Sequence, residues 1–239
     1  MDGLTVVIQA GGESRRMGKP KALVLFCGIP LICQGLKRLG GIADQLIITS
    51  NQLESLDFLC SSVTGDRLEL YNDINETRGA LSGLYTALYY ATQPSVAVVA
   101  CDMVFPSALL LKAEHEMMLE TNADLVVPRT SHGYEPFHAV YRRDTCLAFV
   151  KEALDEGETR ATSWFDRAKI VEFSHDDVLA VDPRGGSFIN VNTPEELKYI
   201  EERILAGEMT KIGGEDGSIP DINAFTMCRK ENFCGHQEP

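Results

Sequence analysis

The chain has 239 residues with a formal net charge of −13 at pH 7, 44% hydrophobic residues and 24% charged residues. This composition suits a soluble globular protein with one large α/β domain, and the acidic balance argues against nonspecific nucleic-acid binding, which requires the neutralisation of many phosphates. No apolar run reaches the roughly 20 residues that span a bilayer, and the first residues do not read as a secretory signal, so we expect a cytoplasmic protein with no membrane partner.

The first predicted element is a buried parallel strand over Leu4–Ala10, whose apolar run ends at a pair of glycines. Gly11 and Gly12 allow the backbone to turn sharply and to approach a ligand without a Cβ in the way. A cluster of cations follows at once: Arg15, Arg16, Lys19 and Lys21. In an acidic chain, this cluster marks the place to which a polyphosphate would be drawn.

Two common phosphate-binding loops do not explain this stretch. A Walker A loop has a glycine, four residues and then Gly-Lys-Ser/Thr, whereas Glu13 stands five residues before Gly18 and Pro20 follows Lys19. The dinucleotide fingerprint Gly-x-Gly-x-x-Gly is not supplied by two adjacent glycines. The remaining alternatives are a phosphate loop of another kind and a plain strand-to-helix turn with solvated basic residues.

Strand-like and helix-like segments alternate along the rest of the chain. Further strands are expected at Gln45–Ser50, Val96–Cys101, Asp124–Val127, Phe137–Tyr141, Lys169–Phe173 and Ser187–Val191. Helices are expected at Pro30–Leu39, Leu81–Ala91, Pro106–Leu119, Arg143–Glu156 and, capped by Thr193, up to Ala206. This order predicts a mostly parallel sheet covered by helices on both faces, with ligands bound at the carboxyl ends of the strands.

The character of the sequence changes after Gly207. Residues 1–207 are predicted to form the domain, and residues 208–239 a flexible tail with little periodicity. The tail contains Cys228, Cys234 and His236, whose spacing is not that of a zinc knuckle and which would need a fourth ligand for a closed zinc site. A tail without a metal is the simpler interpretation.

Asp102 stands at the end of the apolar strand Val96–Cys101, where a carboxylate could hold Mg²⁺ beside nucleotide phosphates. The alternative is that Asp102 caps the helix expected from Pro106. Asn51 likewise follows a strand, and Asp73 precedes a loop with two glycines, so both have polar groups that could contact a ligand. Their alternative role is that of ordinary turn residues.

Asn190 and Asn192 are two residues apart on a predicted strand and should therefore share one face. Because Thr193 already supplies the helix cap, the amides of both asparagines are left for a ligand, which they can both donate to and accept from. His138 could face an acceptor, but a single histidine beside an apolar strand is more often structural.

The pattern Gly-Gly-x-Ser-x-Arg-Met-Gly-x-x-Lys at residues 11–21 resembles the signature loop of the nucleotidyltransferases related to molybdenum cofactor guanylyltransferase, the MobA-like family. Residues 188–197, Phe-x-Asn-x-Asn-Thr-Pro-Glu-Glu-Leu, resemble a second segment of this family. The resemblance covers residues 4 to about 206. It implies a Rossmann-like three-layer α/β/α sandwich similar to the nucleotide-diphospho-sugar transferases.

The resemblance further implies transfer of GMP from GTP to molybdopterin or Mo-molybdopterin, with Mg²⁺ as the cofactor. It implies catalytic roles for Arg16, Lys21 and Asp102, with Asp102 as the metal ligand. The residues implied in ligand binding are Gln9, Ala10, Gly11, Gly12, Lys21, Asn51, Asp73, Asp102, Asn190 and Asn192. Gln9 replaces the usual leucine of the family, so its side chain has no implied role. Molybdoenzymes or their chaperones are the expected recipients of the finished cofactor.

Three alternatives remain open from the sequence. The first is a CTP-dependent molybdopterin cytidylyltransferase, against which Asn190 and Asn192 weigh because related cytidylyltransferases tend to carry aspartate there. The second is nucleotidyl transfer to another small phosphate. The third is a non-catalytic adaptor that binds nucleotide or molybdopterin, against which the retention of Lys21 and Asp102 weighs.

Overall fold

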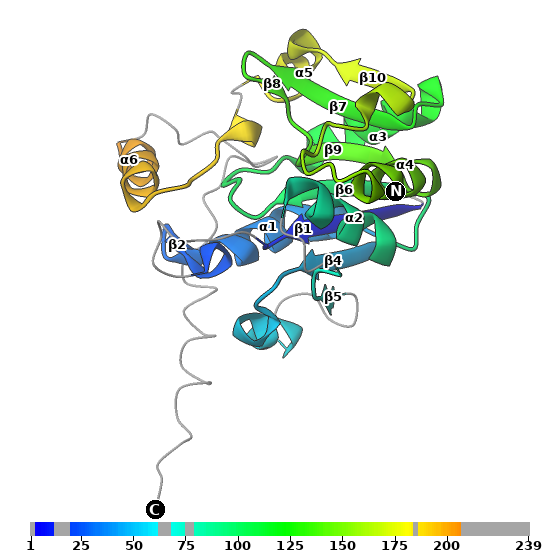
Figure 1. Ribbon diagram of the computed structural model, residues 1–239. Helices are drawn as coiled ribbons and strands as arrows, with labels where there is room; N and C mark the ends of the chain where they lie inside the picture. Colours follow the sequence, from blue (N-terminus) through cyan, green and yellow to red (C-terminus); the bar gives the residue numbers. More distant parts are fainter. Residues whose placement is uncertain (1–2, 12–19, 62–67, 75–78, 184–185, 207–239) are drawn as a thin grey trace, which may run out of the picture.

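The structure, a computed structural model, describes residues 3–11, 20–61, 68–74, 79–183 and 186–206, and the following account concerns these residues. A sheet of eight strands runs through the described chain in the order β10-β7-β9-β6-β1-β4-β5, with β8 paired to β7 (Figure 1). The strands are β1 (Leu4–Gln9), β4 (Gln45–Thr49), β5 (Leu68–Tyr71), β6 (Ser95–Ala100), β7 (Leu125–Thr130), β8 (Gly133–Tyr134), β9 (His138–Arg142) and β10 (Ile170–Phe173).

The sheet is parallel except at β9 and β8. β1 pairs in parallel with β4 and β6, β4 with β5, and β7 with β10, whereas β9 is antiparallel to both β6 and β7. The carboxyl ends of β5, β4, β1 and β6 therefore meet along one edge of the sheet. This edge is where ligands bind in open α/β sheets.

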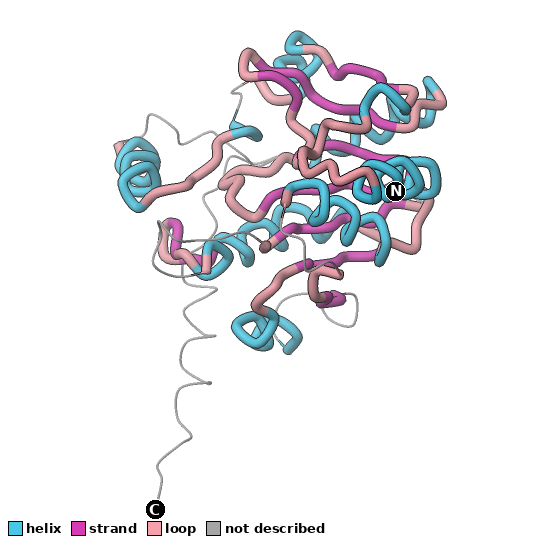
Figure 2. The backbone as a smooth tube through the Cα atoms, in the orientation of Figure 1, coloured by secondary structure: helices cyan, strands magenta, loops and turns pink. Residues whose placement is uncertain are grey.

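Helices cover both faces of the sheet, as Figure 2 shows with the strands between the helices. One face packs on α1 (Leu31–Leu39), α3 (Ala108–Thr121) and α5 (His175–Val181), and the other packs on α2 (Ala80–Tyr90) and α4 (Arg143–Asp155). Along β1, Val6 and Ile8 enter the first core while Val7 enters the second. Burial on both faces explains why β1 is an almost continuous apolar run, and it confirms the predicted three-layer sandwich.

The last helix, α6 (Pro194–Leu205), lies apart from the sheet beside the short hairpin of β2 (Leu25–Phe26) and β3 (Ile29–Pro30) (Figure 1). Thr193 caps α6 by accepting a hydrogen bond from the Glu196 N–H over 3.2 Å, as predicted. Apolar side chains of α6, the hairpin and the segment after Asp102 form a small separate core. Glu201 of α6 also accepts a hydrogen bond from the Cys27 N–H over 2.6 Å, which ties the helix to the hairpin turn.

The prediction of a strand at Ser187–Val191 is wrong. Residues Gly186–Phe188 form a short 3-10 helix, and only a single bridge, between Asn190 and Met103, follows it. The alternating pattern of this segment arises because Ile189 and Val191 pack against the small core around α6, away from the main sheet. The segment pairs with a turn, so it has no strand partner over its length.

Other elements differ from the sequence prediction in smaller ways. Helix α3 is capped by Ser107, which accepts from the Leu110 N–H over 3.2 Å, so Pro106 stands before the helix. The sequence prediction missed β5, α5 and the 3-10 helix over Leu53–Ser61. Short, half-exposed elements of this kind leave only a weak periodic signal.

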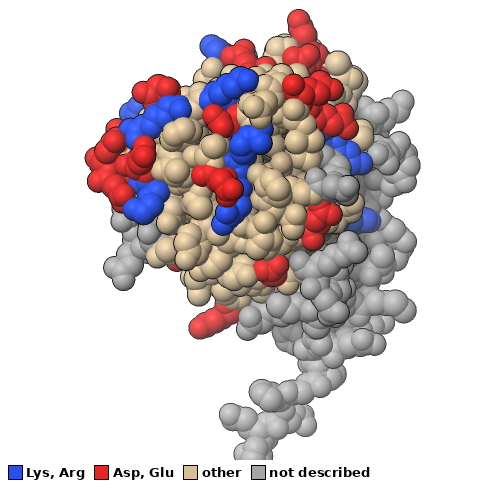
Figure 3. All heavy atoms as spheres, turned by 90° about the vertical axis from the view of Figure 1, so that its right-hand side faces the viewer, with Lys and Arg blue, Asp and Glu red and all other residues tan. Residues whose placement is uncertain are grey.

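The described surface carries mixed charges. On the face shown in Figure 3, basic and acidic side chains are interspersed. Some of the opposite charges of the described surface form ion pairs, such as Lys151 with Asp155, 2.6 Å apart on α4. No helix in the described ranges combines the length and the apolar character needed to span a membrane.

Candidate functional site

The backbone brings the ends of neighbouring strands into one line. Ala10 N–H donates to the Thr49 carbonyl over 2.8 Å, and Cys101 N–H donates to the Gln9 carbonyl over 3.0 Å. The Ser50 N–H donates to the Tyr71 carbonyl, also over 3.0 Å. These bonds fix the residues that follow each strand at the same edge: Gly11, Asn51, Asp73 and Asp102.

Gly11, Asn51 and Asp73 form one side of the site. A Cβ added at Gly11 would lie 3.2 Å from Oδ2 of Asp73, so the bare backbone allows the carboxylate to approach the loop. Burial raises the pKa of Asp73, and the hydrogen bond with the Asn51 side chain opposes this shift by stabilising the charged form. The structure therefore brings together three residues that the sequence predicted separately.

The Gln9 side chain points from the end of β1 to α2. A Cβ added at Gly83 would lie 3.5 Å from both Nε2 and Oε1 of Gln9, so the glycine leaves room for the amide. Nε2 is buried and has no hydrogen-bond partner in the described structure. A buried amide N–H without a partner costs about 1–3 kcal/mol, which makes this amide a feature that packing alone does not explain. The backbone of Ala10 continues from Gln9 into the same edge.

Lys21, Asp102 and Asn192 form the other side of the site. Nζ of Lys21 lies 2.5 Å from Oδ2 of Asp102 and 2.8 Å from Oδ1 of Asn192. The side chains of Lys21 and Asp102 are 20% and 21% exposed, so the ion pair is accessible from solvent. Asp102 does not cap α3, because Ser107 does, and the capping alternative for Asp102 is wrong.

Asn190 and Asn192 lie beside Asp102 without being on a sheet strand. Val191 N–H donates to the Asp102 carbonyl, and Val104 N–H donates to the Ile189 carbonyl, both over 3.1 Å. Both asparagines are exposed. The expected strand is therefore wrong, but Val191 between them is buried while both asparagines are exposed, so they share one side of the segment, and the pairing with the Asp102 turn brings both to the site.

The donor set around Asp102 suits a cation that a nucleotide would share. In the described ranges there is no group of three or more His, Cys, Asp or Glu side chains that could enclose a metal. Mg²⁺ commonly takes one or two carboxylates when phosphate oxygens and water supply its other ligands, and Asp102 offers one partly exposed carboxylate. The described residues could thus supply one carboxylate to a divalent metal shared with a nucleotide, and they include no cluster that would enclose a metal by protein ligands alone.

Several predicted residues lie outside the described part of the chain. Gly12 and Arg16 are among them, so their predicted proximity to Lys21 is not tested by the geometry. The tail residues Cys228, Cys234 and His236 also lie outside it.

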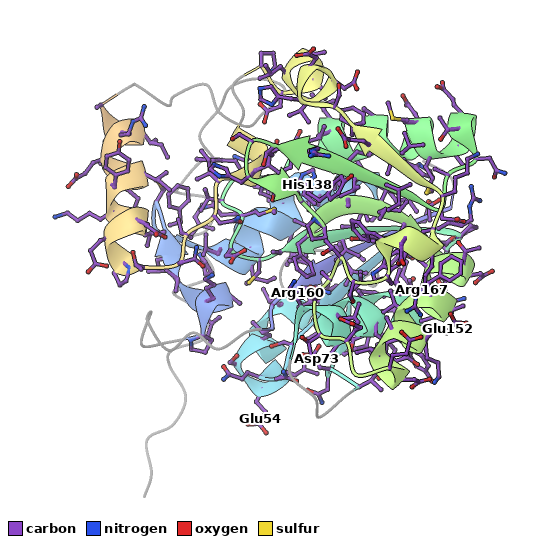
Figure 4. The ribbon with its side chains drawn as sticks, turned by 45° about the horizontal axis from the view of Figure 1, so that its top comes forward. Glu54, Asp73, His138, Glu152, Arg160 and Arg167 are labelled. Carbon is purple, nitrogen blue, oxygen red and sulfur yellow. The ribbon has the colours of Figure 1, made fainter. Side chains whose placement is uncertain are left out.

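Sequence reasoning missed the contact between the segment that follows α4 and the start of α2. Leu81 N–H donates to the Thr159 carbonyl over 3.0 Å, and a Cβ at Gly79 would lie 3.4 Å from the same oxygen. The exposed Arg160 follows directly, and Figure 4 shows it on the same side of the domain as Asp73. A basic residue after the Gly157 turn is the only signal in the sequence, and it is a weak one.

Sequence reasoning also missed the partner of His138. Nδ1 of His138 lies 3.3 Å from Oε1 of Glu114, and both side chains are fully buried. Burial raises the pKa of Glu114 to about 7, and the contact with His138 opposes the shift. The structural interpretation of His138 is confirmed, because the ring lies in the core (Figure 4).

The family model described as the MobA-like NTP transferase domain matches residues 6–173. A molybdenum cofactor guanylyltransferase from Desulfosudis oleivorans is 33% identical over 211 residues, which are 88% of this chain and all of the relative. A probable molybdenum cofactor guanylyltransferase from Natranaerobius thermophilus is 32% identical and covers 82% of this chain and 94% of the relative. The solved structure of molybdopterin-guanine dinucleotide biosynthesis protein A from Archaeoglobus fulgidus is similar with a TM-score of 0.72 and 25% identity, over 86% of this chain and all of that one.

Proposed function

Because the chain belongs to the family of MobA-like NTP transferases, we propose that it transfers GMP from GTP to molybdopterin, with or without bound molybdenum, and releases pyrophosphate. The observation that carries this proposal is the contact of Lys21 with both Asp102 and Asn192 at the carboxyl edge of the sheet. This contact joins Lys21, at the end of the first family segment, to the proposed metal ligand Asp102 and to Asn192 of the second family segment. The relatives' names supply the choice of guanine and of molybdopterin.

The nucleoside of GTP would lie on the side of the site formed by Gly11, Asn51 and Asp73. The Asn51 amide can pair with a base edge or a ribose hydroxyl, and Asp73 can accept from a ribose hydroxyl. The backbone of Ala10 and Gly11 would approach the ligand closely, and we propose Gly12 and Gln9 as further contacts. These roles rest on position and chemistry.

The phosphates would lie toward Lys21 and Asp102. Asp102 would hold Mg²⁺, which supplies charge neutralisation and orients the phosphates when bound. In the structure, Lys21 pairs with Asp102. In the complex, its ammonium would turn to the phosphates, together with Arg16.

The reaction is an in-line displacement at the α-phosphorus of GTP. A terminal phosphate oxygen of molybdopterin forms the new O–P bond, and the bond to the β-phosphate oxygen breaks, with the electron pair leaving on pyrophosphate. Lys21 and Arg16 meet the developing charge. The acceptor phosphate is already ionised at neutral pH, so positioning and electrostatics suffice and no strong general base is required.

Asn190 and Asn192 would orient the acceptor. Both are exposed next to Asp102, and their amides can donate to a phosphate or a pterin and accept from the same ligand. The Glu196 carboxylate accepts from the Asn192 N–H over 2.7 Å, which fixes the backbone at the start of α6.

The remaining expectations belong to the same proposal. Residues 1–207 form the transferase domain, residues 208–239 are a tail without a role in transfer, and the reaction takes place in the cytoplasm. Molybdoenzymes or their chaperones receive the product.

The test is pyrophosphate release with Mg²⁺ and molybdopterin, compared among GTP, CTP, ATP and UTP. We expect release with GTP alone, and only when the acceptor is present. Release with CTP in place of GTP would assign the protein to cytidylyl transfer. GTP binding without release under any condition would contradict transfer to molybdopterin.

A further inference from the structure

Two buried polar side chains contact each other next to the proposed site and have no role in its chemistry. Glu114 on α3 and His138 at the start of β9 are both 0% exposed, with 3.3 Å between Oε1 and Nδ1. Ser107 N–H donates to Nε2 of the same ring over 3.2 Å. Because Nε2 accepts this hydrogen bond, the ring proton is on Nδ1, where it faces the carboxylate of Glu114.

The His138 ring contacts both segments that carry the polar groups of the site. Ser107 ends the turn that begins at Asp102, and its backbone rests on Nε2. Phe188 packs edge-on against the ring with the centroids 5.4 Å apart. Phe188 comes directly before Ile189–Val191, the segment paired with the Asp102 turn. One ring therefore supports the turn and the segment together.

The ring is also fixed relative to the sheet. His138 pairs with Val99 in the antiparallel ladder, and Ala100 N–H donates to the Phe137 carbonyl over 3.0 Å. These contacts are at the end of β6, just before Asp102. A displacement of the ring would therefore change the distance between the end of the strand and the turn that follows it.

The polar pair is costly for a purely structural role. Oε2 of Glu114 is buried without a hydrogen-bond partner in the described structure, and burial raises the pKa of this carboxyl to about 7. Apolar side chains of similar volume often replace a buried polar pair without loss of stability. An apolar pair could not accept a hydrogen bond from the Ser107 N–H. The His138 ring accepts it, and Glu114 holds that ring in the required tautomer.

We propose that Glu114 and His138 are positioning residues for the Asp102 turn: Glu114 holds the proton of His138 on Nδ1, and Nε2 then holds the Ser107 end of the turn. The role of the turn in holding Mg²⁺ rests on the proposed function. The positioning itself is a property of the free protein, so it can be measured without substrate.

The test compares Glu114→Leu and Glu114→Gln in the full chain. Glutamine keeps an acceptor for Nδ1–H, whereas leucine removes it and leaves the tautomer unfixed. Hydrogen–deuterium exchange of the free protein should show faster exchange over residues 102–107 in Glu114→Leu and nearly wild-type exchange in Glu114→Gln. In the presence of GTP, Glu114→Leu should lower the affinity for Mn²⁺, measured by EPR, by about tenfold. It should also lower kcat by about tenfold, with the KM for GTP nearly unchanged.

His115→Leu is the matched control. His115 is the next residue of α3, is also buried, and its Nε2 lies 2.9 Å from Oγ of Ser95 at the opposite end of β6. It should lower thermal stability without changing exchange over 102–107, Mn²⁺ affinity or kcat. Equal exchange over 102–107 in the two leucine variants overturns the positioning role. A wild-type protein that binds no Mn²⁺ with GTP contradicts the proposed metal site instead, and the exchange result still decides the positioning role.

Discussion

The ammonium of Lys21 lies 2.5 Å from the carboxylate of Asp102, at the position from which this carboxylate would hold a cation. Asn192 accepts a second hydrogen bond from the same ammonium over 2.8 Å, so the lysine is held at two points. A divalent cation bound at Oδ2 would compete with Lys21 for the same carboxylate oxygen. We therefore expect a metal at Asp102 to displace Lys21 from Oδ2, with nucleotide phosphates as its new anionic partner.

Lys21→Met should strengthen metal binding in the absence of nucleotide. The substitution removes a positive charge next to Asp102 and leaves the carboxylate accessible. We expect the affinity for Mn²⁺ alone, measured by EPR, to rise by about tenfold, corresponding to about 1.4 kcal/mol. Transfer activity should fall at the same time, because the phosphates lose a cation. An unchanged Mn²⁺ affinity would show that Lys21 does not compete with the metal.

Asp102→Asn should abolish metal-dependent turnover while the fold survives. The side chain is partly exposed, and ion pairs of this kind contribute about 0–1 kcal/mol, so thermal unfolding should shift little. Pyrophosphate release should fall by at least about a hundredfold, because the only proposed protein ligand of Mg²⁺ loses its charge. Asp144→Asn is a control at an exposed ion pair on α4 and should leave release unchanged. Wild-type turnover of Asp102→Asn would remove the metal assignment.

The sequence predicted the parts of the fold in which the residues' preference for strand, helix or cap agrees with their burial in the structure. β1, β4 and β6 are buried on both faces, so their apolar runs are almost uninterrupted, and Thr193 caps α6 with Pro194 at the first position. Ser187–Val191 alternates like a strand, but its apolar residues face the small core around α6. Alternation reports which side chains are buried and does not identify the surface that buries them.

The site was predictable where the parallel topology alone brings residues together. Asp102 and Asn51 each follow a predicted strand, and the parallel strands of one sheet end at one edge, whereas β5, the strand before Asp73, was not predicted. The contact between Lys21 and Asn192 joins residues 171 positions apart through a segment outside the sheet, and no spacing rule gives it. The contact of His138 with Glu114 could not be predicted from the sequence either, because α3 is one of several helices that could cover β9.

Gln9→Leu should separate stability from nucleotide binding. The substitution removes a buried N–H without a described partner and puts an apolar side chain next to Gly83, so the free energy of unfolding should stay the same or rise by about 1 kcal/mol. On the hypothesis that bound GTP accepts from this amide, we expect GTP to bind about three- to tenfold more weakly. Titration calorimetry with GTP and urea unfolding measure the two effects. Unchanged GTP affinity with raised stability would show that the amide does not bind the nucleotide and only destabilises the fold.

The buried carboxyl of Glu114 should make stability depend on pH. Its pKa is raised from 4.5 to about 7, so the folded state binds a proton more tightly than the unfolded state. The stability associated with this proton is complete below about pH 4.5 and is lost as the pH rises through about 7, by on the order of 3 kcal/mol for the isolated group. The groups that face this carboxyl are His138 and, electrostatically, Tyr141.

Glu114→Gln removes this titration and keeps the shape of the side chain. The free energy of unfolding of the variant relative to the wild type should therefore rise from pH 5.5 to pH 7.5 and level off above it. Urea unfolding of both proteins across this range measures the difference, while charges elsewhere in the chain cancel in the comparison. A difference that is constant with pH would show that Glu114 has the same charge in the folded and unfolded states. Burial of an ionised carboxylate would then be fully compensated by the His138 ring.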